Sequence, residues 1–290
     1  MHPLPDALRF CSPEPLIDIG ANLTHESFDK DRDAVLARAL EAGVEALVLT
    51  GTDRHSIEGA LALIEARHDP SPRLFATAGV HPHHAADWGT EYAELIREAL
   101  DRPGMVAVGE CGLDFNRDFS PRDAQRRAFE AQLEIAAERR LPLFLHERDA
   151  STTMLEMLRS WRDDIEDAVV HCFTGDRQTL YAYLDLDLHI GLTGWLCDER
   201  RGLELRELVG EIPLERLMIE TDCPYLLPRN LPAKLKGRRH EPALLPWIAR
   251  EVAGLRGLDE ATLAGAATRT TQRFFRLDST TQLTAIGASR

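Results

Sequence analysis

Short apolar runs alternate with segments of helical pattern along the whole chain, and this alternation constrains the fold more than any other feature. Eight runs are near-continuously apolar, as expected for strands that are buried on both faces. They are LIDIGAN from Leu16, ALVLTG from Ala46, LFATAGV from Leu74, MVAVGE from Met105, LPLFLH from Leu141, AVVHCF from Ala168, LHIGLTG from Leu188 and LMIETD from Leu217. Eight strand–helix units predict a parallel (β/α)8 barrel, with a doubly wound open sheet as the weaker alternative.

A length of 290 residues fits one barrel of about 250 residues with short extensions. We therefore expect a loose N-terminal extension over residues 1–15 and a single barrel domain over residues 16–275. The small, polar residues 276–290 are expected to form a flexible C-terminal tail.

Two segments inside the barrel domain carry local signals. Ser120 is a plausible N-cap, with Pro121 at the first helical position of the next helix. Residues 224–239 are rich in proline, glycine and basic residues, which predicts a loop over the barrel mouth. Helices are expected to resume from about Glu241.

Composition limits the class of protein. No apolar stretch approaches the roughly 20 residues that span a membrane, and the N-terminus does not resemble a secretory signal. Five cysteines, an odd number, fit a reducing compartment. We expect a cytoplasmic monomer without a membrane partner.

Charge argues against a broad nucleic-acid-coating surface, because the net charge is −14 and such affinity comes from neutralised phosphates. A local basic cleft is still compatible with this composition. The clusters Arg200-Arg201 and Lys234-Lys236-Arg238-Arg239 could line one, or could be solvated surface.

Four potential metal ligands, Glu110, His146, His171 and Asp222, stand at the C-terminal ends of apolar runs. Side chains at the carboxyl ends of parallel strands converge on one face of a barrel, where catalytic sites are built. Two imidazoles with two carboxylates suit a divalent metal. The pattern predicts a site for one or two ions, with Mg²⁺ preferred and Mn²⁺ or Zn²⁺ as alternatives.

Cysteines offer a competing interpretation, since Cys111, Cys172 and Cys223 each follow a proposed ligand. A thiolate zinc cluster would use them. Neighbouring side chains on a strand point to opposite faces, so the alternation favours buried cysteines facing the helices.

Longer motifs make the chain recognisable. It carries DIGANLTHESFDKDRD from Asp18, TAGVHPH from Thr77, VGECGLDFNRDFS from Val108, HERDA from His146, HCFTG from His171, GLTGWLCDERRGLELREL from Gly191 and IETDCPYLLPR from Ile219. From Leu16 to about Phe275 the chain resembles the TatD family of metal-dependent deoxyribonucleases, which are amidohydrolase-like barrels. The resemblance implies 3′→5′ trimming of single-stranded DNA, with RNA as an alternative substrate and DNA repair as the setting.

The same resemblance matches Glu110, His146, His171 and Asp222 to the family's metal-binding positions. The resemblance also implies that Asp222 is a general base as well as a ligand. We expect four residues to be catalytic: Asp222, Glu110, His81 and Arg148.

The chain departs from the family at the first strand, where most members have Asp-Thr-His-x-His. Here Gly20 and Asn22 replace both histidines, so one of the family's two metal sites should be weak or completed by water. Mg²⁺ tolerates such a site because it usually keeps several bound waters. A second departure is His240-Glu241-Pro242, where members commonly have Asn-Glu-Pro.

Substrate contacts are expected next to the metal ligands. His81 and His83 could contact phosphate or protonate the leaving oxygen, or only hold a loop. Arg148 lies two residues after His146 and on the same side of the strand, where it could grip a phosphate or form a structural salt bridge.

Weaker candidates surround these positions. Asp114 and Asn116 could orient water from behind the ligands, or cap a turn. His25, Asp53, Arg200 and Tyr225 could touch substrate, and Tyr225 could stack on a base.

Two rival functions stay open at this point. A metal-activated water could attack an ester or amide instead, as in a D-aminoacyl-tRNA deacylase. The loss of histidine at Gly20 and Asn22 also permits a catalytically weak binding or scaffold protein.

Overall fold

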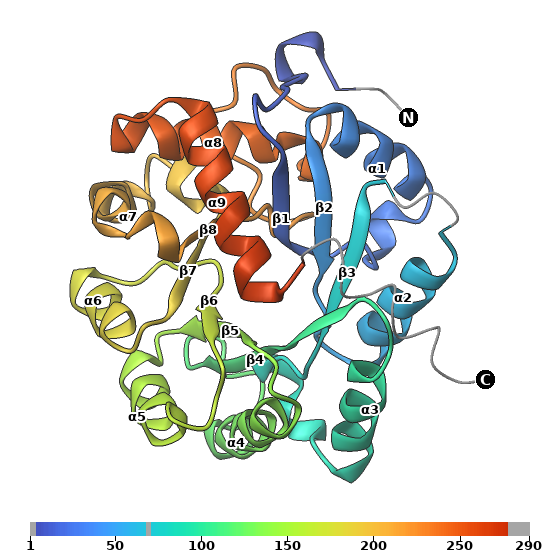
Figure 1. Cartoon of the computed structure of the whole chain (residues 1–290), viewed down its shortest axis with the longest axis vertical. Coiled ribbons are helices and arrows are strands. Elements are labelled where there is room, and N and C mark those ends of the chain that lie inside the picture. Colours follow the sequence, from blue (N-terminus) through green and yellow to red (C-terminus); the bar gives the residue numbers. More distant parts are fainter. Residues whose placement is uncertain (1–3, 68–70, 278–290) are drawn as a thin grey trace.

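Eight parallel strands form the centre of the computed structural model, which describes residues 4–67 and 71–277 (Figure 1). Each strand pairs with the next one in sequence, and a parallel bridge between Ala21 and Cys223 brings the last strand back to the first. The strands are β1 Leu16–Ala21, β2 Val44–Leu49, β3 Arg73–Ala78, β4 Met105–Asp114, β5 Leu143–Arg148, β6 Ala168–Val170, β7 His189–Leu192 and β8 Leu217–Ile219. The predicted barrel is confirmed, and the open sheet is wrong.

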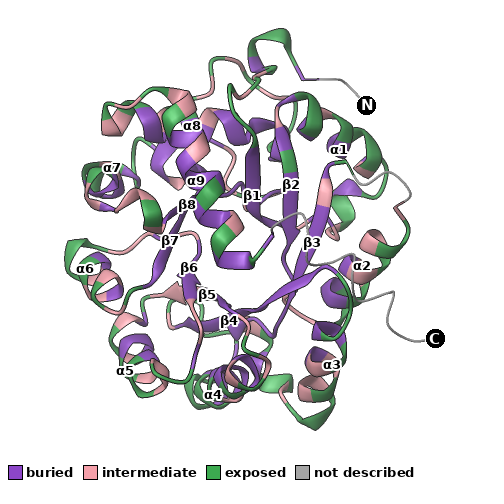
Figure 2. Cartoon of the chain, viewed as in Figure 1, coloured by how far each residue is buried: buried purple, intermediate pink, exposed green. Residues whose placement is uncertain are grey.

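Helices surround this barrel, with their buried faces toward the strands and their exposed faces outward (Figure 2). The α-helices are α1 Arg32–Glu41, α2 Arg54–Glu65, α3 Thr90–Leu100, α4 Arg122–Arg139, α5 Ser151–Trp161, α6 Arg177–Asp185, α7 Leu203–Leu208, α8 Leu245–Arg256 and α9 Glu260–Phe275. Short 3₁₀ turns are η1 Asp6–Leu8, η2 Glu26–Phe28, η3 Pro82–Asp87, η4 Gly194–Cys197, η5 Val209–Glu211, η6 Leu214–Arg216 and η7 Pro242–Leu244. No helix in the described ranges is long and apolar enough to cross a membrane.

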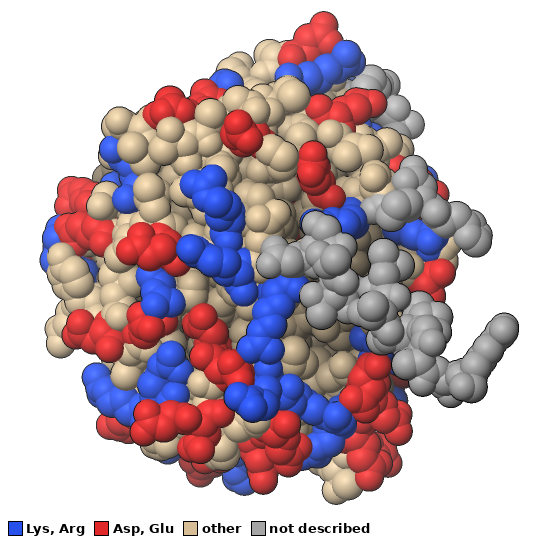
Figure 3. Space-filling view, viewed as in Figure 1, with Lys and Arg blue, Asp and Glu red and all other residues tan. Residues whose placement is uncertain are grey.

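The last helix closes one end of the barrel. Phe274 and Phe275 at the end of α9 cluster with residues of the barrel interior such as Ile17, Phe75 and Met218. Figure 1 accordingly shows α9 lying across the barrel centre. On the same face, Lys and Arg gather in a band among acidic residues (Figure 3). Ile17 and Phe75 lie in the first halves of β1 and β3, so α9 covers the amino ends of the strands, and their carboxyl ends open on the opposite side.

The N-terminal extension differs from the expected loose leader where it is described. Leu4 and Leu8 are buried against Ala42 and Leu244, and the Ser12 N–H donates to the Ala42 carbonyl at 3.0 Å. The apolar side chains of this segment find a hydrophobic surface, which fixes it. The proposed domain divisions stay predictions, and the tail from residue 278 lies outside the described residues.

The predicted N-cap of α4 is also wrong. Pro121 occupies the cap position, and its carbonyl accepts the N–H groups of Ala124 and Gln125. The Ser120 hydroxyl makes other bonds. It donates to the His83 carbonyl at 2.9 Å and accepts the Ala86 N–H at 3.0 Å, so it ties η3 to the loop before α4.

Candidate metal centre and active site

A cavity of about 360 Å³ opens at the carboxyl ends of the strands and collects most of the predicted site residues. Backbone pairing explains their convergence. In the β4–β5 ladder Gly109 pairs with Phe144 and Gly112 with His146, which places Glu110 beside His146. The His171 N–H donates to the Leu145 carbonyl at 3.0 Å, and so continues the β5–β6 pairing past the end of β6.

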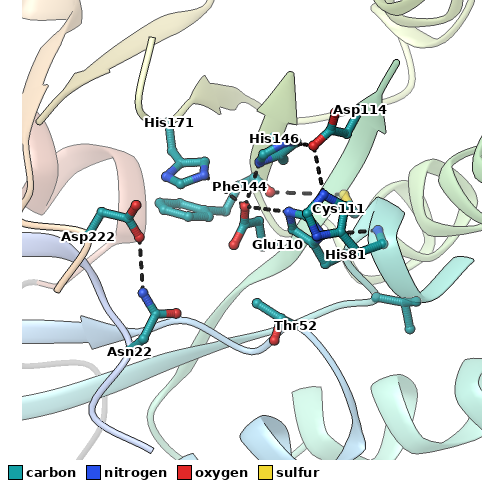
Figure 4. Close-up of polar contacts among 12 residues, drawn as sticks. Asn22, Thr52, His81, Glu110, Cys111, Asp114, Phe144, His146, His171 and Asp222 are labelled. Atoms are coloured by element: carbon teal, nitrogen blue, oxygen red, sulfur yellow. Dashed lines mark hydrogen bonds and ion pairs between the residues drawn. The ribbon is translucent and has the colours of Figure 1, made fainter. Parts of the chain in front are cut away.

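Glu110 is the hub of the site (Figure 4). Its Oε1 atom lies 2.8 Å from His171 Nε2, 2.9 Å from His146 Nδ1 and 3.3 Å from His81 Nε2. Three of the four predicted ligands, Glu110, His146 and His171, are thus in direct contact. His81, expected to be a catalytic or substrate-contacting residue and not a ligand, joins them.

This donor set fits a divalent cation. One ligand atom from each of His81, Glu110 and His146 can be chosen so that all three lie within 4.8 Å of one another. The buried His146 Nε2 has no hydrogen bond of good geometry and lies 3.4 Å from Asp114 Oδ2. Imidazole nitrogens grouped around a carboxylate are ordinary ligands of Mn²⁺ and Zn²⁺, and a carboxylate is the group that Mg²⁺ requires.

Asp222, the fourth predicted ligand, lines the same cavity from the end of β8. Its N–H donates to the Gly20 carbonyl at 2.8 Å, and its Oδ1 accepts a hydrogen bond from Asn22 Nδ2 at 3.0 Å. Asn22 therefore holds the carboxylate of Asp222. Among the described residues, no hydrogen bond or ion pair joins Asp222 to Glu110 or to the histidines.

Asp222, Glu110 and His81, which line the same cavity, have contrasting electrostatics. Burial raises the pKa of Asp222 to about 7, and repulsion by Glu110 and Glu220 adds to this while His171 opposes it. Burial also acts to raise the pKa of Glu110, but the charges of His171 and His81 and the bond from His146 outweigh it and hold that pKa well below 4.5. Burial lowers the pKa of His81 to about 4, so its ring is neutral at pH 7.

Asp114 supports the ligands from behind. Its Oδ2 lies 2.7 Å from His83 Nε2 and 3.4 Å from His146 Nε2. It is itself fixed by its Oδ1, which accepts the N–H groups of Asn116 and Arg117. The Asn116 side chain donates instead to Asp149 at 2.6 Å, outside the cavity.

Arg148 reaches the cavity from the end of β5. Its Nη1 donates to Thr174 Oγ1 at 3.2 Å, and its guanidinium lies over the Trp195 ring at 5.0 Å. No carboxylate in the described part of the chain pairs with it, so its charge is available at the cavity wall.

The weaker candidates separate into two groups. Tyr225 lines the cavity and is 52% exposed. The other three lie outside it: His25 meets the Tyr225 ring edge-on at 5.8 Å, Asp53 caps α2, and Arg200 pairs with Asp198.

The thiolate interpretation does not fit. Cys111 and Cys223 are fully buried in the layer between strands and helices. Cys172 lies at the edge of the cavity, where burial raises the pKa of its thiol to about 12. Among the described residues, the cluster that could hold a metal ion is His81, Glu110 and His146 and contains no cysteine, so the thiolate interpretation is not supported.

Two buried acids were not anticipated. Glu220 Oε1 accepts the Cys172 N–H at 2.6 Å, and its Oε2 lies 3.3 Å from His171 Nδ1. Asp18 accepts the Thr221 hydroxyl at 2.6 Å, and burial raises the pKa of Asp18 to about 7. The available signal was an acid inside an apolar strand run, two positions before Asp222 in the case of Glu220.

A barrel that gathers imidazoles and carboxylates at the carboxyl ends of its strands belongs to the class of metal-dependent hydrolase barrels. The chain belongs, more narrowly, to the TatD related DNase family, whose sequence pattern matches residues 17–276. It is a hydrolase of phosphodiester bonds, as that family is.

Similar proteins agree with this assignment. The chain is 50% identical over 262 residues to the 3′-5′ ssDNA/RNA exonuclease TatD of Salmonella typhimurium, covering 90% of this chain and 99% of that protein. It is 51% identical over 260 residues to the same-named protein of Citrobacter rodentium, covering 90% and 97%. The crystal structure of YJJV, a TatD homologue from Escherichia coli K12, superposes with a TM-score of 0.81 at 27% identity, covering 94% and 100%.

Proposed function

We propose that this protein is a 3′→5′ exonuclease that removes nucleotides from single-stranded DNA in a reaction that depends on a divalent metal, with Mg²⁺ as the resident ion. The cluster of three histidine nitrogens around Glu110 Oε1 carries the proposal. The names of the relatives supply the polarity and the substrate, with RNA as a second substrate.

Glu110, His146 and His171 are the proposed ligands, with Asp222 as the fourth and His81 as a neighbour that can join them. A divalent cation held there would activate the attacking water and polarise a phosphate oxygen. Glu110 and His146 lie within β4 and β5, and His171 and Asp222 follow β6 and β8, so the rigid barrel fixes the spacing of the ligands.

Asp222 is the proposed general base. Its pKa of about 7 matches the working pH of a base better than an ordinary aspartate does. The Asn22 amide orients the carboxylate, so one oxygen is held while the other can accept a proton from the attacking water.

Arg148 and Tyr225 are the proposed substrate contacts. The Arg148 guanidinium has no carboxylate partner among the described residues and can donate two parallel bonds to a phosphate. His83 is held by Asp114 at the cavity rim and can donate to the same substrate. The neutral state of His81 favours ligation or hydrogen-bond donation over the alternative role of general acid. Arg200, bonded to Asp198, is a weaker candidate for substrate contact.

Digestion of 5′-labelled single-stranded DNA with Mg²⁺ tests the proposal. We expect a ladder of shortening products, and we expect Glu110→Gln and Asp222→Asn each to lower the rate by at least about 100-fold. Glu204→Gln on the exposed face of α7 is the matched control. A native protein that is inactive with Mg²⁺, Mn²⁺ and Zn²⁺ would contradict the proposal, and an aminoacyl ester assayed in parallel would reveal the deacylase alternative.

The cellular setting belongs to the same proposal. A cytoplasmic monomer that trims single-stranded ends during DNA repair is the role that this activity would serve.

A further inference from the structure

A second cavity, of about 650 Å³, lies beside the metal cavity between the η4 region and the loop after β8. We call it the strand groove and define it by six of its lining residues. They are Trp195, Arg201, Arg229, Lys234, Leu235 and Arg238. It therefore combines an aromatic ring and an aliphatic wall with four cations.

Contacts join the strand groove to the metal cavity. Arg148 lines the metal cavity, and its guanidinium lies 5.0 Å from the centre of the Trp195 ring. Arg201 lines the groove and lies 4.3 Å from the same ring. At the other wall, Tyr225 lines the metal cavity and its neighbour Leu226 lines the groove. A polymer leaving the metal cavity would enter the groove directly.

The groove is basic in a protein that is acidic overall, with a net charge of −14. Among the described residues, its lining holds a single acid, Asp198, which lies 3.0 Å from Arg201 and 3.7 Å from Arg229. Lys234 and Arg238 are exposed and form no ion pair with any described residue. Lys234 and Arg238 are thus available to bind an anion.

We propose that the strand groove binds the nucleotides on the 5′ side of the scissile bond, an inference that rests on the proposed function. Lys234 and Arg238 would contact backbone phosphates, and the apolar wall at Leu235 would face the bases. Grooves that hold single strands without reading their sequence combine positive charge with apolar or aromatic surface in this way.

Trp195 is a positioning residue in this proposal. Cation–π contact with Trp195 holds both guanidiniums at the boundary between the two cavities. Arg148 and Arg201 can then meet successive phosphates of one strand as it passes from the groove to the metal cavity. Without the ring, the shared contact that orients both guanidiniums would be lost, while Arg148 would keep its bond to Thr174 and Arg201 its ion pair with Asp198.

Binding without cleavage gives the first test. The affinity of fluorescent oligo-dT for the protein is measured in EDTA across a range of salt concentrations. Each phosphate contact on a single strand contributes about 0.7 to the salt slope, so Lys234→Ala/Arg238→Ala should lower the slope by about 1.4. When the salt concentration rises from about 50 to about 200 mM, the affinity of this variant should therefore fall by a factor that is about seven times smaller than the factor for the native protein.

The matched control is Arg159→Ala/Arg269→Ala, which removes two exposed cations from α5 and α9. The slope of this variant should equal the native slope. If Lys234→Ala/Arg238→Ala had the same salt slope as Arg159→Ala/Arg269→Ala, binding of the strand in the groove would be contradicted.

The Trp195 role has its own test. Trp195→Leu should lower the salt slope, and Trp195→Phe, which keeps a ring face for both guanidiniums, should restore it. A slope that does not change in Trp195→Leu would overturn the positioning role.

Cleavage separates this proposal from the proposed function. With Mg²⁺, the native kcat/KM should be higher for a 12-nucleotide strand than for a dinucleotide, which is too short to fill the groove. Lys234→Ala/Arg238→Ala should reduce that ratio. If the native protein cleaves both substrates equally well, the strand groove does not bind the substrate, but the proposed nuclease activity is supported. If the protein cleaves neither substrate but shows the expected difference in salt slope, the proposed nuclease activity is contradicted, and binding in the groove is supported.

Discussion

The carboxylate of Glu220 occupies the space above Gly20, and a Cβ atom on Gly20 would overlap its Oε2. The same carboxylate lies 2.7 Å from the place that a Cβ on Gly191 would take. Most members of the family have a histidine at the position of Gly20. In this chain the absence of a side chain there gives room to a buried acid that faces His171.

Gly20→Ala should therefore destabilise the fold by about 1–3 kcal/mol, the usual cost of overpacking a core. Urea denaturation measures it. Gly254→Ala in α8 is the control, because nothing lies within 4 Å of its added methyl group and alanine favours a helix. A double variant with Glu220→Ala should lose much of the Gly20→Ala penalty. Additive effects would show that the two residues do not compete for space.

Glu220→Gln should weaken metal binding about 10- to 100-fold, as substitutions behind a ligand commonly do. Glutamine keeps the size and can still accept the Cys172 N–H, but it lacks the charge that faces His171 Nδ1. Calorimetric titration with Mn²⁺ measures the affinity, with Glu204→Gln as the control. An unchanged affinity would show that Glu220 only fills space.

The sequence predicted all eight strands because each is a buried apolar run, and local composition carries that information. It did not predict that β4 continues past Glu110 to Asp114, since GLDFN has the composition of a turn. The extension depends on pairing with β5 as far as Arg148, which is a tertiary effect.

Some residues of the candidate site can be predicted from local sequence, and others depend on tertiary structure. Glu110, His146 and His171 were predictable because each closes an apolar strand run or follows it. The contact of His81 with Glu110 depends on the path of the chain after β3, where the His81 N–H bonds to the Thr52 carbonyl at 2.9 Å. Trp195 lies far from Arg148 in the sequence, so only the fold brings them together.

Metal binding should stabilise the native protein. An ion that binds only the folded state at about 100 times its Kd adds about 2.7 kcal/mol, so Mn²⁺ or Mg²⁺ should raise the melting temperature by several degrees. Glu110→Ala should abolish this increase, because Glu110 is the hub of the ligand set. Differential scanning calorimetry with and without EDTA measures it. An equal increase in native protein and Glu110→Ala would place the bound ion elsewhere.

His240→Asn should change how stability depends on pH. His240 is fully buried, and its Nδ1–H donates to the Tyr225 carbonyl at 3.0 Å. Burial lowers the pKa of its ring to about 4, whereas an unfolded histidine titrates near about 6.5. As the pH falls from about 6.5 to about 4, His240 binds a proton in the unfolded chain but not in the folded chain. The free energy of unfolding therefore decreases by up to about 3 kcal/mol.

Asparagine, the residue common in the family at this position, could donate the same hydrogen bond without titrating. Unfolding by urea at pH 7.5, 6 and 5 should therefore show a smaller loss of stability in His240→Asn than in the native protein. His55→Asn, at an exposed position on α2, serves as the control. If the native and His240→Asn proteins lost stability in parallel, His240 would not be the group that responds to pH.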